Sequence, residues 1–207
     1  IIFYSDNGGY GPATSMHPLK GYKGTYYEGG IRVPFFVNWP NVVASDTHCS
    51  TPITGVDIYP TICEMIIGQN YEHYKGDGVS IVPLLKGNKI KDRALYWHFP
   101  AYLQSYQRAD EQPDPLFRAR PCSVIRKGRW KLIEYFENNN VELFDLNEDI
   151  GEKNNLSKRR PEIAKLLKTR LDIWRKKTAA AVPMKKNPDY DAEAGRRAII
   201  EFGRTNN

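Results

Sequence analysis

The amino-acid sequence predicts an α/β fold, which becomes α+β when this chain is taken alone: the end of an α/β sheet, followed by a small antiparallel sheet with one packed helix. Short apolar runs at residues 1–5 and 31–39 flank a glycine-rich segment, an arrangement typical of α/β sheets. From Ser123 onward, period-2 alternation indicates an antiparallel meander, and a helical period over residues 161–174 predicts a helix after it.

The first part of the chain predicts two strands and a helix. Residues 1–5 are β-branched and aromatic and predict a short buried strand, with residues 31–39 as its neighbour in the same sheet. A helix is expected within residues 51–68, where Asp57 is the N-cap and Gly68 ends the apolar period. The glycine-rich segment between the two strands lies where α/β folds place their chemistry.

The second part of the chain predicts the antiparallel subdomain. A strand at residues 93–98 is followed by a polar loop over residues 99–121 with four prolines, which we expect to line a substrate cleft. Pro161 opens the helix that packs on the apolar face of the meander, by a stripe of side chains at Ile163, Leu166, Leu167, Leu171 and Trp174. The three meander strands span residues 123–126, 129–136 and 141–146.

These elements divide the chain into three parts. Residues 1–92 are expected to form the C-terminal end of an α/β domain, residues 93–181 the antiparallel-sheet subdomain with its helix, and residues 182–207 a surface tail. The opening of the chain inside an apolar strand, without an initiator methionine, leads us to expect the C-terminal part of a longer protein.

The composition is that of a globular protein, and the distribution of charge does not indicate a binding surface for polyanions. Of the 207 residues 41% are hydrophobic, and the net charge is +6. The basic residues are interleaved with acids, and the densest groups, at 158–160 and 175–177, lie at the two ends of a predicted helix, so we expect no nucleic-acid partner. No run approaches the ~20 apolar residues of a membrane span. The three cysteines, Cys49, Cys63 and Cys122, are compatible with one disulfide or with none.

Polar groups follow the first strand directly. Asp6 and Asn7 offer a carboxylate and an amide oxygen, which suit a hard divalent cation, although Asp-Asn-Gly is also a common turn. Lys23 stands between glycines, where its ammonium either contacts an anionic ligand or is simply solvated. Glu28 and Arg32, four residues apart, are expected to pair with each other or to brace the loop.

The polar residues of the glycine-rich segment are together explained by resemblance to a known family. Residues 5–34 contain Ser-Asp-Asn-Gly-Gly and then Pro-Leu-Lys-Gly-Tyr-Lys-Gly-Thr-Tyr-Tyr-Glu-Gly-Gly-Ile-Arg-Val-Pro. The combination closely resembles the second half of the active site of formylglycine-dependent sulfatases, in the alkaline-phosphatase-like superfamily. Further stretches resemble the same family as far as about Trp174, at residues 55–61, 77–80, 83–85, 95–98, 128–133, 142–146 and 154–156.

The resemblance implies roles for single residues. Asp6 and Asn7 match two metal ligands of the family, normally for Ca²⁺, with Mg²⁺ as the alternative, and Lys23 matches the catalytic lysine that contacts a sulfate oxygen. His17 and His98 are candidate substrate contacts; the alternatives are an exposed imidazole for His17 and a structural hydrogen bond for His98. The implied substrate is a sulfated small molecule or carbohydrate, and the implied location is periplasmic, extracellular or lysosomal.

The resemblance also implies what the chain lacks. The formylglycine of the family arises in a Cys/Ser-x-Pro/Ala-x-Arg motif, which neither residues 49–53 nor residues 122–126 match. We therefore expect the nucleophile and the other metal ligands in a missing N-terminal half, the main partner of this chain, without which it is inactive. The rival functions are a phosphoesterase or phosphonate hydrolase of the same superfamily, and a non-catalytic binding or structural module.

Overall fold

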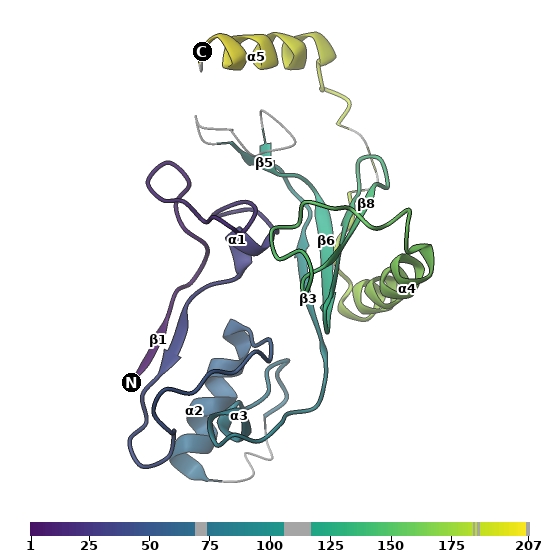
Figure 1. The fold of residues 1–207 in the computed structure, drawn as a ribbon. Coiled ribbons are helices and arrows are strands. Elements are labelled where there is room, and N and C mark those ends of the chain that lie inside the picture. Colours follow the sequence, from purple (N-terminus) through teal and green to yellow (C-terminus); the bar gives the residue numbers. More distant parts are fainter. Residues whose placement is uncertain (69–73, 106–116, 184, 186, 206–207) are drawn as a thin grey trace. The chain divides into compact units, whose positions relative to one another are not determined.

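The computed structural model of the chain describes residues 1–68, 74–105, 117–183, 185 and 187–205 (Figure 1). The chain forms two compact units. Unit 1 comprises Ile1–Asp6 and Pro34–Arg93, and unit 2 comprises Asn7–Val33 and Ala94–Asn207. The division into domains at residues 92/93 and 181/182 stays a prediction.

The sheet of unit 1 has two strands. β1 (Ile2–Tyr4) pairs antiparallel with β2 (Phe35–Val37), and Phe3 lies opposite Phe36. The prediction that the two apolar runs are neighbours is confirmed. The prediction of a buried strand is wrong for this chain, because two strands alone cannot cover both of their faces: Phe3 is 58% and Phe36 65% exposed.

The helices of unit 1 are organised by a buried aspartate. A 3₁₀ turn, η1 (Gly55–Asp57), leads into α2 (Ile58–Ile67), and α3 (Val82–Leu85) follows as a single turn. The carboxylate of Asp57 accepts hydrogen bonds from the backbone N–H groups of Thr54, at 2.8 Å, and Val79, at 2.9 Å, and it forms an ion pair with Arg93. The predicted helix is confirmed, including its end at Gly68, which has a positive φ of 84°.

Unit 2 contains the predicted antiparallel sheet. Four strands lie in the order β3-β6-β7-β8, and every neighbouring pair is antiparallel. The predicted meander and its extra strand are both confirmed. The strands are β3 (Ala94–Phe99), β6 (Cys122–Lys127), β7 (Trp130–Tyr135) and β8 (Val141–Asp145).

Helix α4 (Pro161–Thr178) covers one face of this sheet, as predicted (Figure 1). Leu167 and Leu171 of the helix pack against an aligned row of buried strand residues, Ile125, Leu132 and Leu143. The indole of Trp174 stacks on Tyr96 with ring centroids 4.9 Å apart. Including Leu166 in the packed stripe is wrong: it lies at the edge of the helical face and is 54% exposed.

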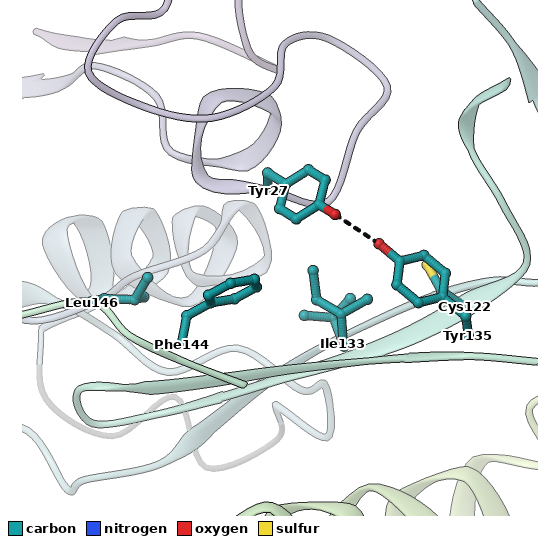
Figure 2. Packing of buried hydrophobic residues seen from close by; sticks show 7 residues of the cluster. Tyr27, Cys122, Ile133, Tyr135, Phe144 and Leu146 are labelled. Atoms are coloured by element: carbon teal, nitrogen blue, oxygen red, sulfur yellow. Dashed lines mark hydrogen bonds between the residues drawn. The ribbon is translucent and has the colours of Figure 1, made fainter. Parts of the chain in front are cut away.

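The opposite face of the sheet is also buried, which the sequence analysis does not predict. Tyr27, just before the short helix α1 (Glu28–Ile31), contributes to a cluster with Ile133 and Phe144. Figure 2 shows the Tyr27 ring above the sheet, with its hydroxyl directed at that of Tyr135, 3.1 Å away. The glycine-rich segment is thus a layer of unit 2.

Two further segments differ from the expectation. The predicted loop at residues 99–121 contains a small ribbon, β4 (Leu103–Gln104) paired with β5 (Phe117–Ala119), while its residues 106–116 lie outside the described part. The predicted tail contains α5 (Ala192–Thr205), whose N-terminus is supported by a hydrogen bond from the Glu193 N–H to the Asp191 carboxylate.

Two further findings concern the cysteines and the apolar character of the helices. The three cysteines, Cys49, Cys63 and Cys122, are free thiols, so the alternative without a disulfide holds. Among the described residues, none of the helices has the length and apolar character needed to cross a bilayer.

Replacing Leu171 by alanine tests the packing of α4. Leu171 is fully buried, so Leu171→Ala should lower the free energy of unfolding by about 2–5 kcal/mol. Leu166→Ala is the matched control on the same helix and should cost less than about 1 kcal/mol, because Leu166 is half exposed. Equal losses in urea unfolding would contradict the described helix orientation.

Candidate active site

The glycine-rich loop of unit 2 is held by backbone hydrogen bonds between segments distant in sequence. The N–H of Gly8 donates to the carbonyl of Gly30 at 3.0 Å, and the N–H of Lys23 donates to the carbonyl of Gly9 at 2.9 Å. A third bond of 2.8 Å joins the Gly29 N–H to the Lys20 carbonyl. The segments after Asn7, around Lys23 and around Gly29 therefore lie side by side.

Two glycines make this close approach possible. A Cβ atom on Gly8 would lie 1.9 Å from the carbonyl oxygen of Gly29, and a Cβ on Gly29 would lie 2.1 Å from the carbonyl oxygen of Gly21. Both distances are far below van der Waals contact, and the obstructing atoms are backbone atoms. The glycine pattern that suggested a loop is thus a steric requirement of its folding.

The structure places the predicted metal and sulfate residues as follows. Asp6 is exposed and is the last residue of its segment in unit 1, whereas Asn7 is half-buried and begins unit 2. Lys23 is exposed at the surface of unit 2. Within unit 2 the bond between Gly9 and Lys23 brings the segment that follows Asn7 next to the lysine.

The two predicted substrate histidines lie in different settings. His17 is exposed in the loop. His98, on β3, has both ring nitrogens engaged: Nδ1 lies 2.8 Å from the Ser123 hydroxyl, and Nε2 lies 2.7 Å from the Ala181 carbonyl. A substrate contact through Nε2 would require replacement of the Ala181 bond.

A buried ion cluster anchors the loop to the sheet. The ammonium of Lys131, on β7, is fully buried and lies 3.1 Å from Glu28 Oε1 and 2.8 Å from Glu152 Oε1. The backbone N–H of Glu28 also donates to Glu152 Oε2, at 2.6 Å. The predicted pairing of Glu28 with Arg32 is confirmed at 3.5 Å, and Arg126 lies 3.6 Å from the same carboxylate.

The two carboxyl groups of the cluster have opposite pKa shifts. Burial alone raises the pKa of Glu28, but Lys131, Arg126 and Arg32 outweigh it, so the pKa falls below its ordinary value of 4.5. Burial raises the pKa of Glu152 above 4.5, and Lys131 only partly offsets this. The difference arises because three cations surround Glu28, whereas the side chain of Glu152 has one.

Sequence reasoning missed Lys131 and Glu152. One signal was available: Lys131 alternates with Ile133 and Tyr135 on one face of β7, so a lysine occupies a position whose neighbours are apolar. A lysine there needs a buried acid, but nothing in the local pattern identifies Glu28 or Glu152 as that acid.

The donors at Asp6 and Asn7 fit a hard cation in kind but not in number. Carboxylate and amide oxygens are the ligands that Ca²⁺ and Mg²⁺ prefer, and Ca²⁺ takes about 6–8 of them. Across the described part of the chain, no group of three or more histidine, cysteine, aspartate or glutamate side chains is placed to hold a metal ion. The roles of Asp6 and Asn7 as metal ligands stay a prediction.

A pocket of rings and arginines lies in unit 2 beside the loop. Its wall combines Tyr26 and Tyr27 of the loop with residues of β5, β6 and β7. Burial raises the pKa of Tyr26 to about 12 and that of the Cys122 thiol to about 12, so both stay protonated at neutral pH. The remaining lining residues are Phe117, Arg118, Ala119, Arg120 and Tyr135.

Comparison with known proteins identifies the class. The chain is 34% identical over 191 residues to a sulfatase of Formosa agariphila, covering 84% of this chain and 32% of that protein. It is 30% identical over 219 residues to arylsulfatase J of Mus musculus, covering 91% of this chain and 36% of that protein. A crystal structure of Ps i-CgsB in complex with k-i-k-neocarrahexaose superposes with a TM-score of 0.67 and 25% identity, over 99% of this chain and 42% of the other.

The fold and these similarities define the C-terminal region of a sulfatase, so the predicted resemblance is confirmed. More narrowly, residues 22–177 match the family described as N-sulphoglucosamine sulphohydrolase, C-terminal, and the chain belongs to that family. The chain spans about a third of the length of the curated relatives it matches.

Removing the central ammonium tests the ion cluster. Lys131→Met leaves two buried carboxylates without their common cation and should lower the free energy of unfolding by about 3–5 kcal/mol. Adding Glu28→Gln and Glu152→Gln to this variant should restore part of the loss, because fewer buried charges then stay unpaired. Lys165→Met, at an exposed site on α4, is the control and should change stability by less than about 0.5 kcal/mol. No recovery in the triple variant would contradict the electrostatic explanation.

The opposite pKa shifts predict opposite pH dependences. The contribution of Glu28 to stability is complete above its ordinary pKa of 4.5 and is lost as the pH falls through its lowered folded-state pKa. That of Glu152 is complete below 4.5 and is lost as the pH rises through its raised pKa. In urea unfolding at several pH values, the destabilisation by Glu28→Gln should shrink toward acid pH, and that by Glu152→Gln should shrink toward neutral pH. Parallel profiles would refute the assignment.

Proposed function

We propose that the protein containing this chain is a sulfuric ester hydrolase that acts on sulfated carbohydrates, and that this chain supplies part of its active site. The observation that carries the proposal is the family match over residues 22–177, which includes Lys23. The motif at Asp6 and Asn7 precedes the matched region and is assigned by its resemblance to the sulfatase motif.

Lys23 is proposed as the group that contacts a sulfate oxygen. Its ammonium would stabilise the negative charge of the transferred sulfuryl group. The surroundings support this role: the backbone of Lys23 is fixed by its bond to Gly9, while the side chain is exposed and able to reach a ligand.

Asp6 and Asn7 are proposed as two ligands of a divalent cation, Ca²⁺ or alternatively Mg²⁺. Such a cation supplies positive charge next to the sulfate oxygens. Their oxygen donors, a carboxylate and an amide, and their consecutive positions in the sequence shortly after β1 support the proposal, and the remaining ligands would come from elsewhere in the protein. The resemblance also supports a formylglycine nucleophile outside this chain and a periplasmic, extracellular or lysosomal location.

A carbohydrate substrate is supported by one solved relative, the structure crystallised with k-i-k-neocarrahexaose. His17 is proposed as a substrate contact because it is exposed between Asn7 and Lys23 in the loop sequence. For His98 the hydrogen bonds to Ser123 and Ala181 favour a supporting role, and a direct contact stays a proposal.

Sulfate release by the full-length protein tests this function. The wild type should hydrolyse an aryl sulfate faster than the matching aryl phosphate, and Lys23→Ala should lower kcat/KM for the sulfate by about 10²–10³-fold. Lys158→Ala is the control, because this lysine is exposed and lies outside the glycine-rich loop. It should change kcat/KM by less than about twofold. Faster hydrolysis of the phosphate ester would favour the rival phosphoesterase, and an unchanged Lys23→Ala variant would exclude the lysine from catalysis.

A further inference from the structure

Gly9 connects the backbone of Lys23 to a methionine side chain. The carbonyl of Gly9 accepts the N–H of Lys23 at 2.9 Å. The N–H of Gly9 donates to the thioether sulfur of Met16, with 3.3 Å between nitrogen and sulfur. Met16 therefore holds the residue that in turn holds the backbone of the proposed sulfate lysine.

The side chain of Met16 also lies directly against Gly9. A Cβ atom built on Gly9 would lie 2.7 Å from the sulfur of Met16 and 2.4 Å from the methyl carbon of Thr14. Any side chain at residue 9 would displace these two neighbours. The absence of a Cβ at Gly9 is thus what lets the methionine sulfur reach the N–H group.

The position of Met16 is fixed from its own backbone. Its carbonyl accepts the N–H of Leu19 at 2.8 Å, which closes a turn shortly before Lys23. The residue after that turn, Lys20, is tied to the rest of the loop by its bond from the Gly29 N–H. The half-buried side chain of Met16 therefore joins this turn to the segment that follows Asn7.

The placement of the Lys23 backbone matters for the reaction. A lysine side chain is a flexible four-carbon stem, so the point from which it starts limits where its ammonium can reach. Displacing a catalytic group by about 1 Å can lower a rate by on the order of 10²-fold. A contact that fixes this starting point contributes to catalysis without touching the substrate.

We propose that Met16 is a positioning residue for the reaction. Its thioether holds Gly9, and Gly9 holds the backbone of Lys23 at the place from which the ammonium reaches the sulfate. This inference rests on the proposed function and deepens it by a residue that acts through Gly9 and Lys23. A thioether is a weak hydrogen-bond acceptor, so the expected effect of its loss is moderate.

Two variants of Met16 in the full-length protein test the role of the sulfur. Met16→Leu keeps an apolar side chain but removes the acceptor, and it should lower kcat/KM for an aryl sulfate by about 3- to 10-fold. Met16→Gln keeps an acceptor on a side chain of similar length and should stay closer to the wild type. Met65→Leu, at a half-buried methionine of α2, is the matched control and should leave kcat/KM unchanged. An unchanged Met16→Leu variant, or an equal loss in Met16→Gln, would overturn the proposal.

A double-mutant cycle with Lys23→Ala separates positioning from a general structural role. Because Met16 acts through Lys23, Met16→Leu should change kcat/KM of the Lys23→Ala variant by less than about twofold. The same 3- to 10-fold loss in both backgrounds would mean that Met16 acts independently of the lysine, which contradicts the proposal.

Amide hydrogen exchange separates this inference from the proposed function, because it needs no activity. In Met16→Leu the amides of Gly9 and Lys23 should exchange about threefold or more faster than in the wild type, whereas the amide of Leu132 in the sheet should keep its rate and report an intact fold. If the wild type releases no sulfate, the proposed function fails, and the exchange rates still test the link from Met16 to Lys23. An unchanged rate at Lys23 would refute the link even in an active sulfatase.

Discussion

The buried ammonium of Lys131 is the interaction on which the candidate site depends. A lysine without solvent exposure is tolerated only if it is paired. Its two partners come from separate segments: Glu28 lies 103 residues away in the glycine-rich loop, and Glu152 lies in the segment after β8. Glu28 also begins the short helix of the glycine-rich loop. Moving the loop off the sheet would separate this buried charge from a partner, so the cluster fixes the loop that carries Lys23.

The sheet of unit 2 is therefore covered on both faces, by α4 on one and by the glycine-rich loop on the other. On one face α4 packs through Leu167 and Leu171, which is an ordinary apolar contact. On the other face the loop packs through Tyr27, and there the apolar contact is supplemented by buried ions and tyrosine hydroxyls. The antiparallel sheet of unit 2 therefore supports the loop that carries Lys23, the proposed sulfate contact.

Local patterns predicted the meander, its extra strand, α2, α4 and the pairing of Glu28 with Arg32, because period-2 alternation, helical spacing and i,i+4 contacts are visible within short windows. The loop as a second layer on the sheet could not be predicted in this way. Lys131 lies 103 residues from Glu28, and Glu28 lies 124 residues from Glu152. Likewise, the hydrogen bond from Gly9 to Met16 depends on how the loop folds back on itself, which composition does not specify.

Amide hydrogen exchange of the full-length protein, compared with its Glu28→Gln variant, tests the central claim most directly. The claim predicts that the amides of Gly8, Lys23 and Gly29, which donate the cross-loop hydrogen bonds, lose protection together in the variant. The amides of Ile125 and Leu132 in the two inner strands of the sheet should keep theirs. Unchanged protection of the three loop amides would contradict the view that the ion cluster holds this loop in place.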